Sequence, residues 1–438
     1  MKPFPVFNRR EVMAGLGAAA LCPASGVAVP QAPAPLVLEA RVGTMTLRSG
    51  QPATPVWELS PSTPDNGVRL RRGDRFELSL KNNLKVAAAL GWHGLDGAAA
   101  AEPLAARRPT APGGQESLTI SMTHAGTLTA DLRLLEDGTG LPARPLPLIV
   151  GESEPVVVDR DEIILLEDWR LSAEGAAQVP GAAAPDSPPL YTVNGQMMPD
   201  LSVRQNERLR LRFINGCHRA VVAIKIEGHE VVVMALDGQP AEPFLARNGA
   251  LVLAPGGRCD TFIDATGQAG SVSSILLHDG KEARVVARVV TSSEAPLRPS
   301  RLPPAPPLPS NGLPEQLDLK GALRVDVALA GAPKDWVRPA DFSASAPPAF
   351  RVKRGRVVVL ALSNRAETTT IFHLHGHHFR VLDRLDDGWK PYWLDTLAIE
   401  PGQTQRIAFA ASHAGRWLIE SFAAAWAAPR LVRWYAVE

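Results

Sequence analysis

The chain has 438 residues, which is too long for one ordinary hydrophobic core and suits two or three domains. Hydrophobic residues make up 45% and charged residues 21%, values that are typical of a soluble globular protein. The 46 basic and 45 acidic residues leave a net charge of +1, and this balance argues against nucleic acid as a partner.

Residues 1–32 have the layout of an export signal. Arg9 and Arg10 form a pair, and the Ala- and Gly-rich apolar run after them stops near Pro30. That run is too short to span a membrane, so we expect no stable membrane insertion. A chance arginine pair is the alternative. The pattern resembles a twin-arginine signal, cleaved after Ala28 or shortly beyond, and predicts a periplasmic location for the mature protein.

Two phrases recur three times in the same order. The first reads RRGDRFELSLKNN from Arg71, RQNERLRLRFING from Arg204 and KRGRVVVLALSNR from Lys353. The second reads APGGQESLTISM, APGGRCDTFIDA and EPGQTQRIAFAA, from residues 111, 254 and 400. Each first phrase predicts a strand closed by an Asn, and each second phrase predicts a Pro-Gly turn followed by a strand. The repetition predicts three copies of one β domain.

The copies predict an all-β protein of three tandem β-sandwiches, at residues 36–153, 154–293 and 323–438. The alternation of Leu209, Leu211 and Phe213 predicts one buried face of a sheet. Residues 294–322 are rich in Pro, which predicts a stiff extended linker across the surface.

The mature chain has two cysteines, Cys217 and Cys259, because Cys22 lies in the signal. An oxidising compartment would allow them to pair as a disulfide. Two free buried thiols are the equal alternative, and the sequence does not separate them.

Four of the ten histidines fall in HLHGHH, residues 373–378. Such a cluster is typical of a transition-metal site. Any further ligands must come from elsewhere in the chain.

Three tandem β-sandwiches, with GWHG in the first and FHLHGHHF in the third, resemble the multicopper oxidases. VNGQMMPDLSVRQNERLRLRFINGC and LAPGGRCDTF match the second domain of that family, and LDTLAIEPGQTQRI and AGRWLIESF match the third. The resemblance runs through essentially the whole mature chain. It implies that each domain is a cupredoxin-like Greek-key β-sandwich.

The resemblance also implies copper sites. The family holds a blue copper by two His and a Cys thiolate, and a trinuclear copper cluster by eight His that reduces dioxygen. Here the blue-copper places hold Thr370, Ser421 and Trp426, with Leu431 for the Met. The cluster places keep His93, His373 and His375, and the others hold Gly91, Asp131, Arg133, Glu420 and Phe422. The resemblance therefore implies a chain that cannot run the oxidase cycle.

Two interpretations of the surviving histidines remain. In the first, no cofactor binds, His93, His373 and His375 are hydrogen-bonded core residues, and Arg133 pairs with Glu420 or Asp131. In the second, the three histidines bind one copper or zinc ion, with Asp131 or Glu420 as a further ligand.

The other histidines are expected outside the ligand set. We expect His377 and His378 to support the site or to lie on the surface. The remaining histidines match no ligand place and need no special role: His124, His218, His229, His278 and His413.

Two classes of function follow. The first is a non-enzymatic protein of the envelope, because one branch of the superfamily is exported by the twin-arginine route, has lost its coppers and serves as a cell-division scaffold. Its partners would be envelope or division proteins. The alternative is a copper-binding oxidoreductase with a residual metal site at His93, His373 and His375.

Overall fold

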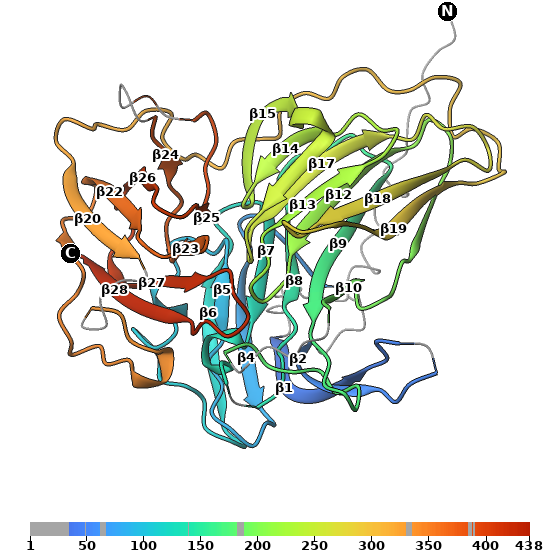
Figure 1. Ribbon diagram of the computed structural model, residues 1–438. Helices are drawn as coiled ribbons and strands as arrows, with labels where there is room; N and C mark the ends of the chain where they lie inside the picture. Colours follow the sequence, from blue (N-terminus) through green and yellow to red (C-terminus); the bar gives the residue numbers. More distant parts are fainter. Residues whose placement is uncertain are drawn as a thin grey trace, which may run out of the picture. The chain divides into compact units, whose positions relative to one another are not determined.

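The computed structural model describes residues 35–438 except 49, 62–66, 139, 182–187, 330–334, 384–387 and 389. The described residues form strands and short 3₁₀ turns and contain no α-helix (Figure 1). The prediction of an all-β protein is therefore confirmed. The expected export signal, with Arg9, Arg10 and Cys22, lies outside the described residues.

The sandwich nearest the N-terminus pairs two four-stranded sheets. Its elements are β1 (Leu36–Met45), β2 (Thr54–Pro61), β3 (Val68–Arg71), β4 (Arg75–Asn82), β5 (Gly91–His93), η1 (Ala99–Ala101), β6 (Gln115–Ser121), β7 (Gly126–Asp131), η2 (Arg133–Leu135) and β8 (Leu146–Gly151). The strand orders are β2-β1-β4-β6 and β3-β8-β7-β5. We call this part domain one.

Domain two pairs a six-stranded with a five-stranded sheet. Its elements are β9 (Arg160–Trp169), β10 (Leu190–Val193), β11 (Asp200–Val203), β12 (Arg208–Asn215), β13 (Val222–Ile226), β14 (Val232–Leu236), β15 (Gln239–Leu245), η3 (Arg247–Gly249), β16 (Ala250–Leu253), β17 (Arg258–Asp264), β18 (Val272–His278) and β19 (Ala283–Thr291). The strand orders are β10-β9-β12-β17-β14-β15 and β11-β19-β18-β13-β16.

Domain three pairs a four-stranded with a five-stranded sheet. Its elements are β20 (Leu323–Leu329), η4 (Pro339–Asp341), β21 (Arg351–Val352), β22 (Val357–Asn364), β23 (Thr370–Leu374), β24 (Arg380–Val381), β25 (Thr396–Ile399), β26 (Thr404–Ala410), β27 (Gly415–Ala423) and β28 (Leu431–Val437). The strand orders are β20-β22-β26-β24 and β21-β28-β27-β23-β25.

The repeated phrases form the same strand pair in every domain. The first phrase supplies β4, β12 and β22, and the second supplies their antiparallel partners β6, β17 and β26. On the other side, each first-phrase strand pairs in parallel with the opening strand of its domain, which is β1, β9 or β20. The repetition in sequence is thus a repetition of sheet topology.

The Asn that closes each first phrase fixes the following turn. Asn82, Asn215 and Asn364 are all buried. Each side-chain oxygen accepts the backbone N–H two residues further on, at 3.0, 3.0 and 2.9 Å, and each amide nitrogen donates to two backbone carbonyls. Such side-chain turns satisfy backbone groups that would otherwise be buried without a partner.

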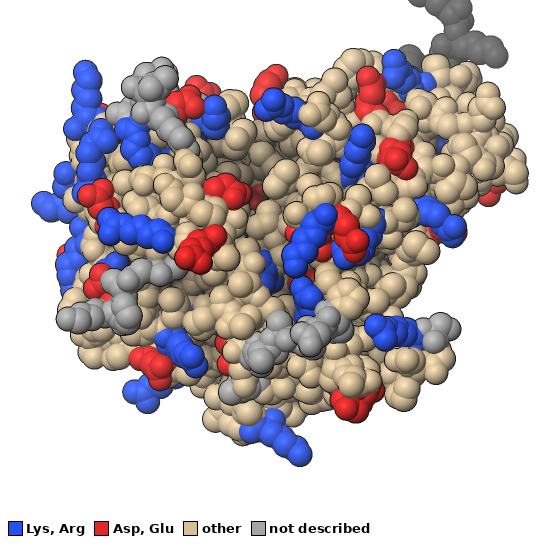
Figure 2. Space-filling model, viewed as in Figure 1, with Lys and Arg blue, Asp and Glu red and all other residues tan. Residues whose placement is uncertain are grey.

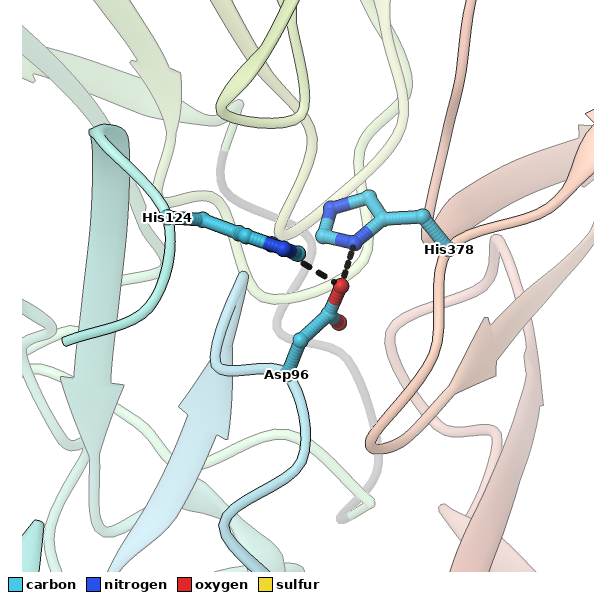
Figure 3. A group of neighbouring side chains, drawn as sticks. All are labelled: Asp96, His124 and His378. Atoms are coloured by element: carbon cyan, nitrogen blue, oxygen red, sulfur yellow. Dashed lines mark hydrogen bonds and ion pairs between the residues drawn. The ribbon is translucent and has the colours of Figure 1, made fainter. Parts of the chain in front are cut away.

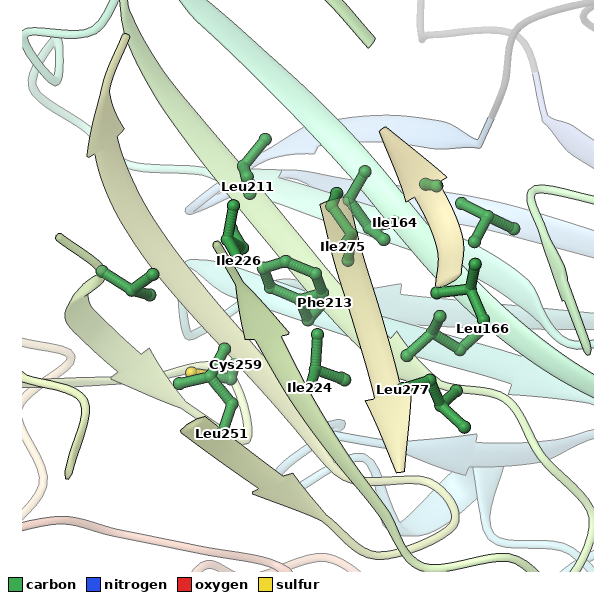
Figure 4. Close-up of a cluster of buried hydrophobic side chains, with 14 of the residues drawn as sticks. Ile164, Leu166, Leu211, Phe213, Ile224, Ile226, Leu251, Cys259, Ile275 and Leu277 are labelled. Atoms are coloured by element: carbon green, nitrogen blue, oxygen red, sulfur yellow. The ribbon is translucent and has the colours of Figure 1, made fainter. Parts of the chain in front are cut away.

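The core of domain two includes Leu209, Leu211 and Phe213, which are fully buried as the alternation predicted. Figure 4 shows Leu211 and Phe213 in this core. The opposite face of β12 is buried as well, although it carries arginines. Arg210 and Arg212 both contact Asp260, at 2.7 and 2.8 Å. Arg212 also donates to the Thr127 hydroxyl of domain one at 2.8 Å. Domain one covers this face, so the arginines are buried as ion pairs.

Cys217 and Cys259 are free buried thiols, so the disulfide alternative is wrong for this structure. The strand register supplies the reason. Cys259 pairs with Phe213, four residues before Cys217 along the chain. Cys217 lies past the end of β12, in the turn that Asn215 holds, so the register does not set it opposite Cys259.

The Pro-rich segment between β19 and β20 contains no strand, but it is packed more closely than a surface linker. Leu308, Asn311 and Leu317 are buried. Asn311 accepts the N–H of Ala125 at 2.9 Å and donates to its carbonyl oxygen at 2.8 Å. The segment is thereby fixed to domain one.

The surface shows no single-sign charge field on the face drawn in Figure 2, where acidic and basic side chains are interspersed. This agrees with the net charge of +1. Within the described residues, no helix has the length and apolar character needed to cross a bilayer.

Arg258 of β17 joins the three domains through one buried guanidinium. It binds both carboxylate oxygens of Asp395 in domain three, at 2.9 and 2.7 Å. It also donates to the carbonyl oxygens of Thr127 in domain one and Asp237 in domain two, at 3.2 and 2.8 Å. Such a cation must be fully paired, because an unpaired buried charge is costly.

We expect Arg258→Met to destabilise the protein by about 3–5 kcal/mol, because Asp395 would lose its buried counter-ion. Chemical denaturation at neutral pH measures the change. Arg288→Ala is the matched control, since the Arg288–Asp200 pair in the same domain is exposed on both sides and should be worth about 0–1 kcal/mol. Equal losses in the two variants would contradict the role of Arg258.

Candidate functional site

The candidate site lies where β5 and η1 of domain one meet β23 and β27 of domain three. β23 lies between β25 and β27, and its register sets His373 opposite Glu420 and Phe372 opposite Ser421. The same sheet thus carries the ligand places of the third-domain motifs. His93 ends β5, which pairs with β7 in the other contributing sheet.

The structure brings His93, His373 and His375 together, and all three are buried. The rings of His93 and His373 stack with centroids 4.1 Å apart, and the centroids of His373 and His375 are 4.7 Å apart. The three surviving ligand places therefore form one histidine cluster. What the cluster can bind depends on how its ring nitrogens are already used.

His375 has a carboxylate at each ring nitrogen. Its Nδ1 lies 2.9 Å from Glu102 Oε1, and its Nε2 lies 2.8 Å from Glu420 Oε1. Burial disfavours the charged imidazole, but the two carboxylates outweigh burial and raise the pKa of His375 to about 10. His375 is therefore a cation at neutral pH, with no lone pair left for a metal.

Glu420 also forms a close ion pair with Arg430, which is buried and lies over the ring of Phe422 at 4.4 Å. Burial disfavours the charge on Glu420, but Arg430 and His375 overcome it and hold the pKa of this carboxyl well below its usual range. Glu102, His375, Glu420 and Arg430 thus alternate in sign, so the four side chains form a neutral charge network.

His373 and His93 are neutral, in contrast to His375. His373 Nδ1 lies 3.1 Å from the carbonyl oxygen of Asp395 and 3.0 Å from Thr396 Oγ1. The Thr396 hydroxyl donates to Asp395 Oδ1, so Nδ1 carries the ring proton. Burial, together with the positive charge of His375, lowers the pKa of His373 to about 4. Burial and His373 likewise lower the pKa of His93.

The space beside the rings is small. The cavity lined by Trp92, Glu102, His373, His375 and Trp417 has a volume of about 10 Å³, roughly what one water molecule needs. His93 Nδ1 faces no hydrogen-bond partner among the described residues. A three-copper cluster does not fit this arrangement, because its space is filled and one of the three surviving histidines is held as a cation.

The blue-copper place is also closed. The Thr370 hydroxyl donates to Asn364 at 3.0 Å, so it is used in the turn that follows β22. Ser421 is buried and offers a neutral hydroxyl in place of a thiolate. Ile371 and Phe422 pack beside it in an apolar cluster with Ala254. Without a thiolate, these residues do not fit a blue copper.

Arg133 does not neutralise this site. Its guanidinium donates to the carbonyl oxygens of Ala143, Cys217 and Gly216. The predicted Arg133–Glu420 pair is therefore wrong, because Arg430 occupies that role. Asp131 contacts Arg133 only through the backbone N–H of Arg133, at 3.1 Å, so neither predicted ion pair forms.

His377 is a buried core histidine, so of the two alternatives, a supporting residue or a surface residue, the surface position is wrong. Its Nδ1 lies 2.7 Å from the Tyr435 hydroxyl, which donates to the carbonyl oxygen of His375 at 2.7 Å, and its Nε2 accepts the N–H of His413 at 3.2 Å. Burial lowers its pKa to about 3. His378 is buried too, and it lies near His124 rather than in the cluster.

The sequence reasoning missed Glu102, Arg430 and Asp395. Glu102 and Arg430 stand alone in Ala-rich stretches, AAAAEPLAA and AAWAAPRLV. A single charge in an apolar stretch next to a ligand motif was the available signal. Their partners could not be read from spacing, because Glu102 also accepts the N–H of Leu418, 316 residues away.

Comparisons with known proteins identify the family of the chain. Two family models, both described as multicopper oxidase, match residues 160–275 and 316–438 and together cover more than half of the chain. Multicopper oxidase MmcO of Mycobacterium tuberculosis is 24% identical over 84% of this chain and 81% of its own. Copper resistance protein A of Pseudomonas syringae pv. tomato is 23% identical over 42% of this chain and 39% of its own.

Solved structures show the same fold. The multi-copper oxidase from Pseudomonas thermotolerans has a TM-score of 0.77 at 24% identity and covers 92% of this chain and 98% of its own. Lac15 from a marine microbial metagenome has a TM-score of 0.74 at 27% identity and covers 92% and 100%. The fold is therefore that of tandem cupredoxin-like sandwiches. The chain belongs to the multicopper oxidase family.

We expect the stability of the protein to fall as the pH rises from 6.5 to 10. The pKa of His375 is about 10 in the folded state and about 6.5 when unfolded. Its contribution is therefore complete below pH 6.5 and is lost as the pH approaches 10, by about 1 kcal/mol per pH unit. Denaturation measured across this range tests the slope.

Glu102→Gln is the matched variant, because its side-chain oxygen can still accept the N–H of Leu418. Removing one carboxylate should lower the pKa of His375 and move the alkaline loss to lower pH. Titration of the His375 imidazole by NMR reports the pKa directly. A value near 6.5 in the wild type would show that the network does not hold His375 as a cation.

Proposed function

We propose that this member of the multicopper oxidase family does not run the oxidase cycle and is a non-enzymatic protein of the cell envelope. The observation that carries the proposal is the placement of His375 between Glu102 and Glu420. Arg430 pairs with Glu420, so two positive side chains balance two carboxylates. Copper ions bound in this place would be repelled by the positive charges of His375 and Arg430. The protein side chains already supply the charge balance that metal ions provide in the family.

The blue-copper place supports the same conclusion. Electron entry in the family requires a Cys thiolate on the copper, and position 421 is Ser. Cys217 and Cys259 lie in the core of domain two and cannot substitute. Burial raises the pKa of both thiols well above the usual value, so neither is a ready thiolate.

The envelope location is inferred from residues 1–32, whose paired arginines and short apolar run favour twin-arginine export. An exported chain with this fold and without oxidase chemistry fits a scaffold that binds envelope or cell-division proteins. The alternative is a copper-binding oxidoreductase with an ion at His93, His373 and His375. Its support is Nδ1 of His93, which has no hydrogen-bond partner within the described part of the chain.

We expect copper-loaded protein to be colourless and to lack oxidase activity with phenols or metal ions. Visible absorption and oxygen uptake, with a laccase assayed in parallel as the positive control, measure this. The physical reason is the absence of a thiolate ligand at Ser421. An intense blue band, or copper-dependent oxygen uptake, would refute the non-enzymatic proposal.

We expect Arg9→Lys with Arg10→Lys to leave the protein in the cytoplasm, because the arginine pair is the recognition element of the twin-arginine route. Cell fractionation compares the double variant with the wild type. Arg69→Lys is the control for an Arg-to-Lys change outside the signal. Normal periplasmic delivery of the double variant would rule out this route.

A further inference from the structure

A second group of metal-binding side chains lies outside the ligand places of the family. Asp96 follows β5, His124 lies between β6 and β7, and His378 lies between β23 and β24. Figure 3 shows the three side chains pointing toward one another. Asp96 Oδ2 is 3.1 Å from His124 Nδ1 and 2.8 Å from His378 Nδ1, and the three atoms lie within 4.8 Å of one another.

We propose that Asp96, His124 and His378 form a binding site for one divalent transition-metal cation, with Zn²⁺ as the best match. Two imidazoles and a carboxylate are a common Zn²⁺ ligand set, with ligand bonds of about 2.0–2.2 Å. In a tetrahedral site such bonds separate neighbouring ligand atoms by about 3.3 Å. The present contacts need to widen by only a few tenths of an ångström.

His378 is oriented as a metal ligand. Its Nε2 lies 2.8 Å from the carbonyl oxygen of Asp237, which can only accept, so Nε2 carries a proton. Metal-binding histidines usually donate their second ring N–H in this way, which fixes the tautomer and the ring orientation. Burial lowers the pKa of His378, but Asp96 outweighs burial and raises it to about 9, so a metal ion would displace a proton from Nδ1, which already points at Asp96.

The amide of Gln239 fixes the state of His124. Asn311 donates to Gln239 Oε1 at 3.0 Å, and Asn311 is itself oriented by the backbone N–H and carbonyl of Ala125. The nitrogen of the Gln239 amide therefore faces His124 Nδ1, 3.1 Å away, and donates to it. His124 must accept this bond with its Nδ1 lone pair.

Asp96 consequently meets the protonated Nδ1 of His378 and the lone pair of His124, and a metal ion here would take over the places of the His378 proton and of the Gln239 N–H. A proton on His378 Nδ1 satisfies one contact but leaves the carboxylate facing the His124 lone pair. A proton on His124 Nδ1 as well would set that N–H against the N–H of Gln239. A cation between the three atoms satisfies both carboxylate contacts at once, which protons alone do not achieve.

The burial of the three residues suits a bound ion with one route of entry. The side chains of Asp96 and His378 are 4% and 0% exposed, whereas that of His124 is 13% exposed. The ion would enter from the His124 side, where water can complete its coordination. Because Asp96 and His124 belong to domain one and His378 to domain three, the ion would also link these domains.

This site is independent of the proposed envelope role and of any oxidase chemistry. An ion that binds only the folded protein stabilises it in proportion to its occupancy. Zn²⁺ should therefore raise the melting temperature of the full mature chain after treatment with a chelator. Titration calorimetry should give one Zn²⁺ per chain. Co²⁺ in its place should show the visible bands of a tetrahedral site.

His124→Ala is the main variant, because His124 is partly exposed and its loss leaves the Asp96–His378 contact in place. We expect Zn²⁺ affinity to fall by more than about tenfold and the chelator effect on the melting temperature to disappear. His229→Ala, which removes a partly exposed histidine of domain two, should bind Zn²⁺ as the wild type does. Circular dichroism checks that each variant is folded.

His93→Ala separates this site from the histidine cluster. We expect it to keep Zn²⁺ binding and the chelator effect. No Zn²⁺ binding by the wild type, or unchanged affinity in His124→Ala, would overturn the proposal. Loss of binding in His93→Ala with retention in His124→Ala would assign the ion to the cluster of His93, His373 and His375, and would overturn it as well.

Discussion

The arrangement of the candidate site depends on the burial of one guanidinium. Arg258 binds the Asp395 carboxylate and carbonyl oxygens from the other two domains. The carbonyl oxygen of Asp395 in turn holds Nδ1 of His373, so this ion pair also sets the ring orientation in the cluster. Burial alone would lower the pKa of Arg258, but Asp395 and Asp237 raise it. The domain junction is therefore held by protein charges, and it can persist without copper.

The same requirement, that buried charges be paired, also applies to the residues at the copper-cluster place. Ligands for a cation cluster must be neutral or negative, and a site that loses its metal leaves negative groups uncompensated. Here His375 and Arg430 supply two positive charges against Glu102 and Glu420. To bind at His375, a metal ion would have to displace a proton from an imidazole whose pKa is about 10. On the proposed function, the network leaves neither the charge nor the volume for a copper cluster.

The sequence predicted what depends on local pattern. The repeated phrases predicted paired strands because turn residues and alternation act over a few positions, and each phrase became the same strand in its domain. The survival of three histidines was read from motifs. Their electrostatic partners were not, because Arg430 and Glu102 reach the site from loops whose spacing carries no pattern. Arg133 was predicted to pair with Glu420 because their motifs are neighbours in the family, whereas in η2 its guanidinium donates to the carbonyl oxygens of Ala143 in domain one and of Gly216 and Cys217 in domain two.

Two histidines of one motif, His375 and His378, have different surroundings, although only two residues lie between them. His375 has a carboxylate at both ring nitrogens, so the proton is the best cation available to it and no lone pair is left. His378 has the carbonyl oxygen of Asp237 at Nε2, with Asp395 Oδ2 3.8 Å away, and at Nδ1 a carboxylate that it shares with His124. A proton on His378 leaves that carboxylate facing the His124 lone pair, whereas the proposed metal ion would contact all three side chains. The shared carboxylate, which His375 lacks, is therefore what distinguishes the proposed metal site from the histidine cluster.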